Sequence, residues 1–219
     1  LSISSEESAK PWSGHVAYCF KNGLELQQSM MQALLLNARF IDMETYAFAW
    51  SGRIAEIRRA GYLYLLVAHV GAIAILLCFG VLQANTGDYT FANMRAQQLP
   101  PFWASCGFLL ALVGFGAKAG ILPLHAWLPE AHPAAPSPVS ALMSGVMLKT
   151  AIYGLLRVTF DLLNVQIGWW GTLALALGLL TALYGVIFAA VQSDMKRLLA
   201  WSSIENIGVI LAAFGLTLI

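Results

Sequence analysis

Apolar residues occur in long runs along this chain, and short polar stretches separate one run from the next. A helix needs about 20 mainly apolar residues to cross the hydrocarbon core of a bilayer. Five runs reach that length, at residues 62–84, 102–122, 139–160, 167–191 and 195–219. The pattern therefore predicts an all-α fold, a polytopic transmembrane helical bundle of about five or six spans.

The second run carries the signs of one broken helix, because Gly116, Gly120 and Pro123 interrupt its end. Backbone groups that such a break frees at membrane depth are tolerated only where they line a cavity or lie buried in protein. Broken helices of this kind occur at ion and substrate sites of transporters. The alternative is an ordinary kink near the membrane surface.

Composition places the chain among integral membrane proteins. Hydrophobic residues make up 59% of it and charged residues 11%, whereas a soluble domain carries about 25% charged residues. The net charge of +1 argues against a nucleic-acid partner. The three cysteines lack the spacing of metal ligands, and the sequence motifs of nucleotide-binding and redox enzymes are missing. We therefore expect no metal site and no cofactor on this chain, and we expect any electron transfer in partner subunits.

Basic residues predict how the spans are oriented. Arginines including Arg58 precede the first span, and the pair Lys196–Arg197 follows four crossings later, which returns the chain to the same side. Arg95 and Arg157 flank the opposite side. The positive-inside rule then places the ends at Arg58 and Lys196 in the cytoplasm.

The two ends of the sequence differ from its middle. Residues 1–26 are polar and patternless, and the stretch 27–50 includes Arg39, Asp42 and Glu44 in a moderately apolar run. The chain also stops inside an apolar run. These features predict a fragment of a longer polytopic protein, with an N-terminal segment that is non-native or frameshifted.

Two lysines lie inside predicted spans, Lys118 in the second run and Lys149 in the third. A lysine at the centre of a spanning helix costs roughly 2.5–3.5 kcal/mol on insertion scales. Such residues usually face the interior of a bundle or a hydrated path, so lysines in successive spans indicate ion or proton handling. The alternative is that one or both side chains extend to the membrane interface.

A few other polar residues are candidates for the same chemistry. His125 follows Lys118 by seven residues, which places both on one face of a continuous helix, although Pro123 argues against continuity. Glu205 in the fifth run is a candidate proton site or a charge partner for a lysine. The alternative for Glu205 is an interfacial carboxylate paired with Arg197.

Three further positions have simpler explanations. His69 in the first run is either a buried neutral histidine bonded to a backbone carbonyl or a proton relay. Glu130 and His132 fall in a Pro-rich stretch, where a solvated loop is favoured over an entrance for protons. Asp194 precedes the last run and is expected to cap its helix.

The residues around both lysines resemble one known family. The stretch GFGAKAGILPLHAWLPEAHPAAPSPVSALMSGVMLKTAIYGLLRV resembles the antiporter-like membrane subunits of respiratory complex I and its relatives, and DMKRLLAWSSIENIG matches the same family. These residues are most similar to the hydrogenase-4 type, component B, of energy-converting hydrogenase and formate hydrogenlyase complexes. The resemblance covers residues 46–219, as helices five to ten of a longer membrane domain, and leaves 1–45 as a divergent N-terminal segment.

The resemblance implies roles for individual residues. Lys118 falls on the lysine of the family's broken seventh helix, which handles the proton, and Lys149 falls on the lysine of the eighth helix, which passes it onward. His125 and His132 match positions in the motif that connects these helices. Glu205 matches a glutamate of the hydrogenase-4 branch.

One expected residue of the family is out of place. Members pair the seventh-helix lysine with a glutamate in the fifth helix, and alignment places Arg39 at that position. Glu44 lies five residues away and is the nearest candidate for the pairing carboxylate.

The resemblance implies a proton- or sodium-translocating membrane subunit of a redox-driven complex, of the hydrogenase-4/formate hydrogenlyase or NADH-quinone oxidoreductase type. Its partners would be the lipid bilayer, other membrane subunits and a peripheral redox arm, in the plasma membrane of a bacterium or archaeon. Such a subunit belongs to an oxidoreductase complex and carries no redox centre of its own. The alternatives are a subunit of a stand-alone Mrp-type cation/proton antiporter and an inert truncated fragment.

Overall fold

The computed structural model describes residues 55–84, 90–163, 165 and 167–219, so the predictions for residues 1–45 and for Glu44 lie outside the described residues. Every regular element in the described ranges is helical. The α-helices are α3 (Ala55–Gln83), α4 (Phe91–Ala96), α5 (Pro101–Ala119), α6 (Leu128–Ala134), α7 (Ser137–Leu142), α8 (Leu148–Leu156), α9 (Gly168–Ala190) and α10 (Met195–Leu218). Two π-helical turns, η1 (Met143–Met147) and η2 (Arg157–Leu162), flank α8.

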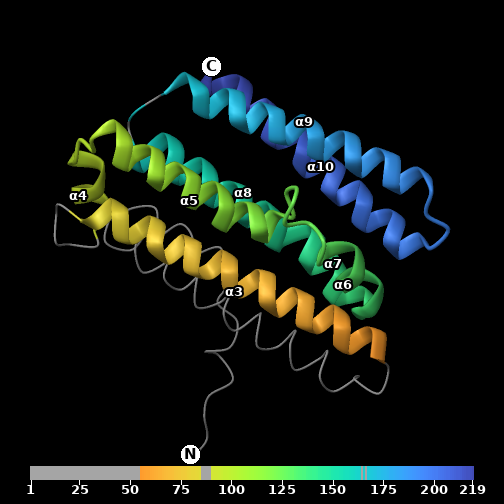
Figure 1. Ribbon diagram of the computed structural model, residues 1–219. Coiled ribbons are helices and arrows are strands. Elements are labelled where there is room, and N and C mark those ends of the chain that lie inside the picture. The colour runs from red at the N-terminus through yellow and green to blue at the C-terminus, as the bar shows by residue number, and fades with distance from the viewer. Residues whose placement is uncertain (1–54, 85–89, 164, 166) are drawn as a thin grey trace, which may run out of the picture.

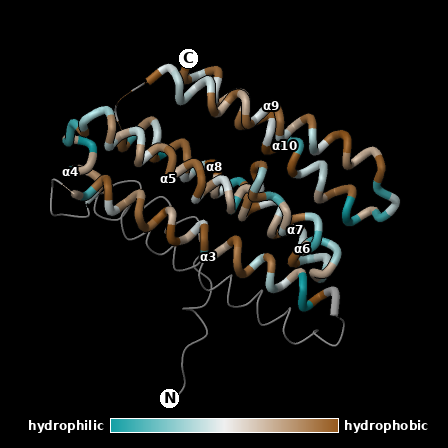
Figure 2. Tube along the Cα trace, in the orientation of Figure 1, coloured by the Kyte–Doolittle hydropathy of each residue, from teal (hydrophilic) through white to brown (hydrophobic). Residues whose placement is uncertain are grey.

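The five predicted spans are confirmed. Helices long and apolar enough to cross a membrane cover Ile57–Gln83, Pro101–Ala119, Ser137–Leu162, Gly168–Ala190 and Met195–Leu218. The third of these consists of α7, η1, α8 and η2 joined end to end. Hydrophobic residues line the long helices in Figure 2, and hydrophilic ones gather near their ends. The chain is a multi-pass membrane protein.

The described helices form three layers (Figure 1). Helix α3 packs on α5, α5 packs on α8, and α9 pairs with α10 on the far side of α5 and α8. The short helix α6 contacts both α3 and α10. The middle layer therefore holds both candidate lysines, Lys118 on α5 and Lys149 on α8.

Helices α9 and α10 approach each other through glycines. A Cβ atom at Gly178 would lie 2.8 Å from the Cα of Ala212, and one at Gly208 would lie 2.8 Å from that of Ala182. Small residues let helices in membranes pack backbone against backbone, because lipid offers no competing hydrophobic force. These glycines thus bring α9 and α10 into direct backbone contact.

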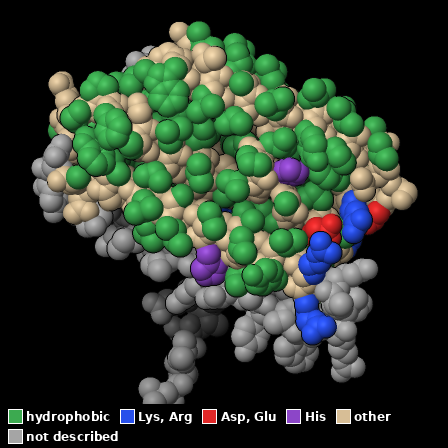
Figure 3. Space-filling view, in the orientation of Figure 1, with side chains coloured by type: hydrophobic (Ala, Val, Ile, Leu, Met, Phe, Trp, Pro, Cys, Tyr) green, Lys and Arg blue, Asp and Glu red, His purple; other side chains and the backbone are tan. Residues whose placement is uncertain are grey.

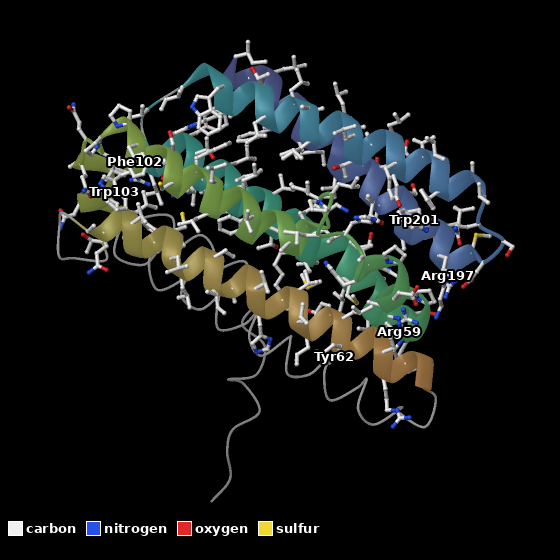
Figure 4. All side chains as sticks on the ribbon, in the orientation of Figure 1. Arg59, Tyr62, Phe102, Trp103, Arg197 and Trp201 are labelled. Carbon is white, nitrogen blue, oxygen red and sulfur yellow. The ribbon has the colours of Figure 1, made fainter. Side chains whose placement is uncertain are left out.

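The charged residues divide between the two ends of the bundle, as the sequence predicts. Arg59 and Arg197 lie at one end in Figure 4, and Phe102 and Trp103 lie at the other. At the first end Arg197 pairs with Glu130 at 3.7 Å. Lysine and arginine side chains gather beside acidic ones in the same region of Figure 3. The cytoplasmic orientation of this end stays a prediction.

At the opposite end one carboxylate joins two helices. Asp161 in η2 accepts from Arg95 of α4 at 2.7 Å and from Arg157 at 3.1 Å. This agrees with the prediction that Arg95 and Arg157 share a side. The expected cap of α10 is also confirmed, because the Asp194 carboxylate accepts from the backbone nitrogen of Lys196.

Candidate functional site

The predicted break after Lys118 is confirmed. Helix α5 ends at Ala119, and Gly120 turns the chain with φ +79°, a left-handed conformation that favours glycine. The backbone N–H groups of Gly120 and Ile121 both donate to the carbonyl of Gly116 at 2.9 Å. The chain then runs through turns to α6 at Leu128.

Side chains from other parts of the bundle satisfy backbone groups at the break. The indole of Trp127 donates to the carbonyl of Ala117 at 2.9 Å. The hydroxyl of Thr181 on α9 accepts from the backbone N–H of Leu122 at 3.3 Å. Thr181 is fully buried and donates in turn to the carbonyl of Leu177. The break is therefore held inside protein, as irregular backbone at membrane depth requires.

Lys118 lies in the last turn of α5, directly before the break, with only 8% of its surface exposed. Its ammonium nitrogen is 5.5 Å from the ring centroid of Tyr64 on α3. This burial argues against the alternative that Lys118 extends to the membrane interface. The structure thus places a cationic side chain between two helices of the bundle.

Lys149 occupies a different environment on α8, where its side chain is exposed among the described residues. Its ammonium donates to the carbonyl of Ser144 at 2.6 Å. Ser144 lies in η1, where the change from α- to π-helical bonding alters which carbonyls are available, and π-turns of this kind are frequent at functional sites. The Ser144 hydroxyl also bonds the hydroxyl of Ser203 on α10 at 3.0 Å. Lys149 therefore connects, through Ser144, to the polar part of α10.

Glu205 lies on α10 where that helix meets α9. A Cβ atom at Gly185 would come within 2.9 Å of the Cα of Glu205, so the backbones touch there. The side chain is partly exposed among the described residues. The alternative that Glu205 pairs with Arg197 is not what the structure shows, because Arg197 lies against Glu130.

His125 lies in the turns between α5 and α6. Its ring contacts Tyr184 of α9 at 5.2 Å and Trp201 of α10 at 5.6 Å between centroids. Partial burial lowers the pKa of His125 below its ordinary value. Because the helix ends at Ala119, His125 does not share a helix face with Lys118 and instead docks on the α9–α10 pair.

His132 and His69 differ from their predicted surroundings. His132 is 2% exposed within α6 and forms a 2.6 Å hydrogen bond with the hydroxyl of Ser140, so the solvated-loop interpretation is wrong for this residue. The cause is tertiary packing of α6 between α3 and α10. His69 donates from Nδ1 to the carbonyl of Leu65 at 2.7 Å, as one alternative expects, but it is exposed rather than buried among the described residues.

We expect the stability of the folded protein to fall on acidification because of His132. Helix α6 lies outside the five spans, and burial lowers the pKa of His132 from 6.5 to about 4. Between these values the unfolded chain binds a proton that the folded chain does not. Stability is therefore unaffected by this group above pH 6.5 and falls as pH decreases from 6.5 to about 4, by at most about 1.4 kcal/mol per pH unit.

Thermal unfolding in detergent between pH 7.5 and 4.5 measures this effect. The variant His132→Asn keeps a group that can bond Ser140 but does not titrate, and its unfolding temperature should depend less steeply on pH. An equal slope in both proteins would show that His132 does not carry the effect.

Comparison with known proteins places this arrangement in a family. Residues 43–219 match the family described as NADH:quinone oxidoreductase/Mrp antiporter, transmembrane. The chain belongs to this family. The family resemblance that the sequence suggested is thereby confirmed, including its hydrogenase-4 branch, as the individual relatives show.

Among the relatives, hydrogenase-4 component B of Escherichia coli is 52% identical over 163 residues, which cover 73% of this chain and 24% of that protein. Formate hydrogenlyase subunit 3 of the same organism is 38% identical, over 72% of this chain and 26% of that protein. The chain thus spans about a quarter of the length of these curated family members. A chain of the membrane-bound sulfane sulfur reductase, an archaeal respiratory membrane complex, superimposes with a TM-score of 0.70 at 26% identity, over 78% of this chain and 36% of that chain.

Sequence reasoning identified both lysines but missed the residues that surround them. Tyr64, Trp127 and Thr181 carry no signal in the sequence, because aromatic residues and threonine are common in spanning helices. Ser144 was missed as well, because its role depends on the π-helical turn. The predicted roles of the site residues stay predictions, and the structure supplies the contacts by which they can be tested.

Proposed function

We propose that this chain forms part of an ion-translocating membrane subunit of a redox-driven complex, and that it moves protons or sodium ions. The observation that carries the proposal is the position of Lys118, buried directly before a helix break and against the ring of Tyr64. A buried cation at a broken helix is a costly arrangement, which ion-transporting proteins use at their sites. The relatives in hydrogenase-4 and formate hydrogenlyase support the redox-driven type.

In the proposed mechanism Lys118 loads and releases a proton. A carboxylate brought close to the amine favours the charged form, and its withdrawal within a poorly solvated site favours the neutral form. A redox event in a neighbouring subunit drives this alternation. Lys149 receives the proton next, on the helix α8 that packs directly against α5. His125, His132 and Glu205 support the path at the ends of this central region, and Glu44 is the candidate for the carboxylate.

The redox chemistry belongs, in this proposal, to other subunits. This chain contributes no cofactor, and it works with further membrane subunits and a peripheral redox arm in the plasma membrane of a bacterium or archaeon. The alternative is a subunit of a stand-alone Mrp-type antiporter, and it is retained because the family description names both classes. An inert truncated product is the remaining alternative.

Affinity purification from the native membrane in mild detergent tests the proposal against these alternatives. We expect hydrogenase or quinone-oxidoreductase subunits to co-purify with the tagged protein and to retain their redox activity. Co-purification of other antiporter subunits alone would support the Mrp type instead. A protein that assembles with neither group would contradict the proposal and favour an inert product.

A further inference from the structure

We propose that Tyr64 is a positioning residue for Lys118, and that the face of its ring holds the ammonium form of the lysine between translocation events. The proposal rests on the proposed function, since it gives Lys118 the role of ion carrier. Tyr64 belongs to α3, which sequence reasoning treats only as a membrane span. The structure gives this helix a direct contact with the central lysine of the site.

The Tyr64 ring is fixed by neighbours from two further elements. Tyr64 is 1% exposed, and its ring meets Trp127 edge-on with centroids 5.0 Å apart. Its hydroxyl donates to the sulfur of Met147 at 3.6 Å. Trp127 is itself anchored to the carbonyl of Ala117, the residue before Lys118. The ring is therefore held relative to the backbone of Lys118 by hydrogen bonds and packing, in addition to its contact with the ammonium.

The contact between ring and ammonium depends on charge. The face of an aromatic ring carries partial negative charge, so it attracts a cation within about 6 Å and attracts a neutral amine far less. The attraction is larger where water is excluded, and Lys118 is 8% exposed. Tyr64 therefore stabilises the loaded form of Lys118 selectively and leaves the released form nearly unaffected.

The same tyrosine also reaches the helix of the second lysine. Met147, which accepts its hydroxyl, is the last residue of η1, and Ser144 of the same turn holds the ammonium of Lys149 through its carbonyl. Contacts on each side of η1 thus lead from Lys118 to Lys149 through Tyr64. A single side chain of α3 positions one lysine and contacts the π-turn that positions the other.

A series of fluorinated phenylalanines at position 64 tests the charge-dependent contact. Each added ring fluorine weakens the negative potential of the ring face and hardly changes its shape, so folding is preserved. The measurement is ion uptake, as protons and as sodium, by inverted vesicles that carry the assembled complex and are driven by its own redox reaction. We expect Tyr64→Phe to pump close to the wild-type rate, and pumping to fall stepwise with fluorination, by about tenfold at three fluorines.

Tyr62 provides a matched control on the same helix, because its side chain is 65% exposed and Figure 4 shows it on α3. The same series at position 62 should leave pumping unchanged. Pumping that is insensitive to fluorination at position 64, or that rises with it, would overturn the role of Tyr64. The variant Lys118→Ala separates the two proposals: if it still pumps, the proposed function fails, and if it does not pump while the fluorine series is flat, only the inference about Tyr64 fails.

Discussion

Replacing Lys118 by alanine is expected to abolish ion pumping while electron transfer by the partner subunits continues at a measurable rate. Alanine removes the titratable amine that the structure places directly before the break in α5. Ion uptake should fall to the level of vesicles treated with an uncoupler. Redox activity lies in other subunits in this mechanism, so the consumption of electron donor should persist. Both quantities are measured in the same vesicle preparation.

The variant Lys118→Arg tests whether a titratable group is needed or a fixed charge suffices. Arginine keeps the positive charge and can still lie against the ring of Tyr64, but it does not release its proton in a protein. We therefore expect Lys118→Arg to assemble and to pump no better than Lys118→Ala. Pumping by the arginine variant would show that proton loading at this position is not part of the mechanism. Unchanged pumping by both variants would remove Lys118 from the path.

The spans and the break were predictable because they depend on local chemistry. Runs of about 20 apolar residues leave few alternatives to spanning helices. Gly120 and Pro123 marked the break, since glycine accommodates the left-handed turn and proline cannot continue the hydrogen bonding of a helix. The lysines were conspicuous for the same reason, because a charge within an apolar run stands out without any knowledge of its neighbours.

The surroundings of the lysines were not predictable, because they are set by contacts between distant segments. Tyr62 and Tyr64 are two residues apart in the same apolar run, yet one is 65% exposed and the other 1% exposed. Nothing in the sequence separates them, and only the packing of α3 against α5 and α6 decides which one meets Lys118. His132 was misjudged for the same reason, since burial in α6 follows from tertiary contacts rather than from the Pro-rich composition of its stretch.

The variant Gly208→Ala is expected to destabilise the α9–α10 pair strongly. Its new methyl group would lie 2.8 Å from both the Cα of Ala182 and the carbonyl oxygen of Gly178. Backbone atoms cannot rotate away as a flexible side chain can, so the two helices must separate along their contact. Overpacking of this kind costs roughly 3 kcal/mol, and thermal unfolding in detergent measures the loss.

Gly168→Ala is the matched control, because it adds the same methyl group to α9 at a position with no described atom within 4 Å. Its unfolding temperature should stay close to that of the wild-type protein. Separation of α9 from α10 also affects the site, because Thr181 of α9 accepts from Leu122 in the break and His125 docks between the two helices. We therefore expect Gly208→Ala to reduce pumping more than it reduces electron transfer. Equal stability of the two alanine variants would show that close backbone contact at Gly208 does not hold these helices together.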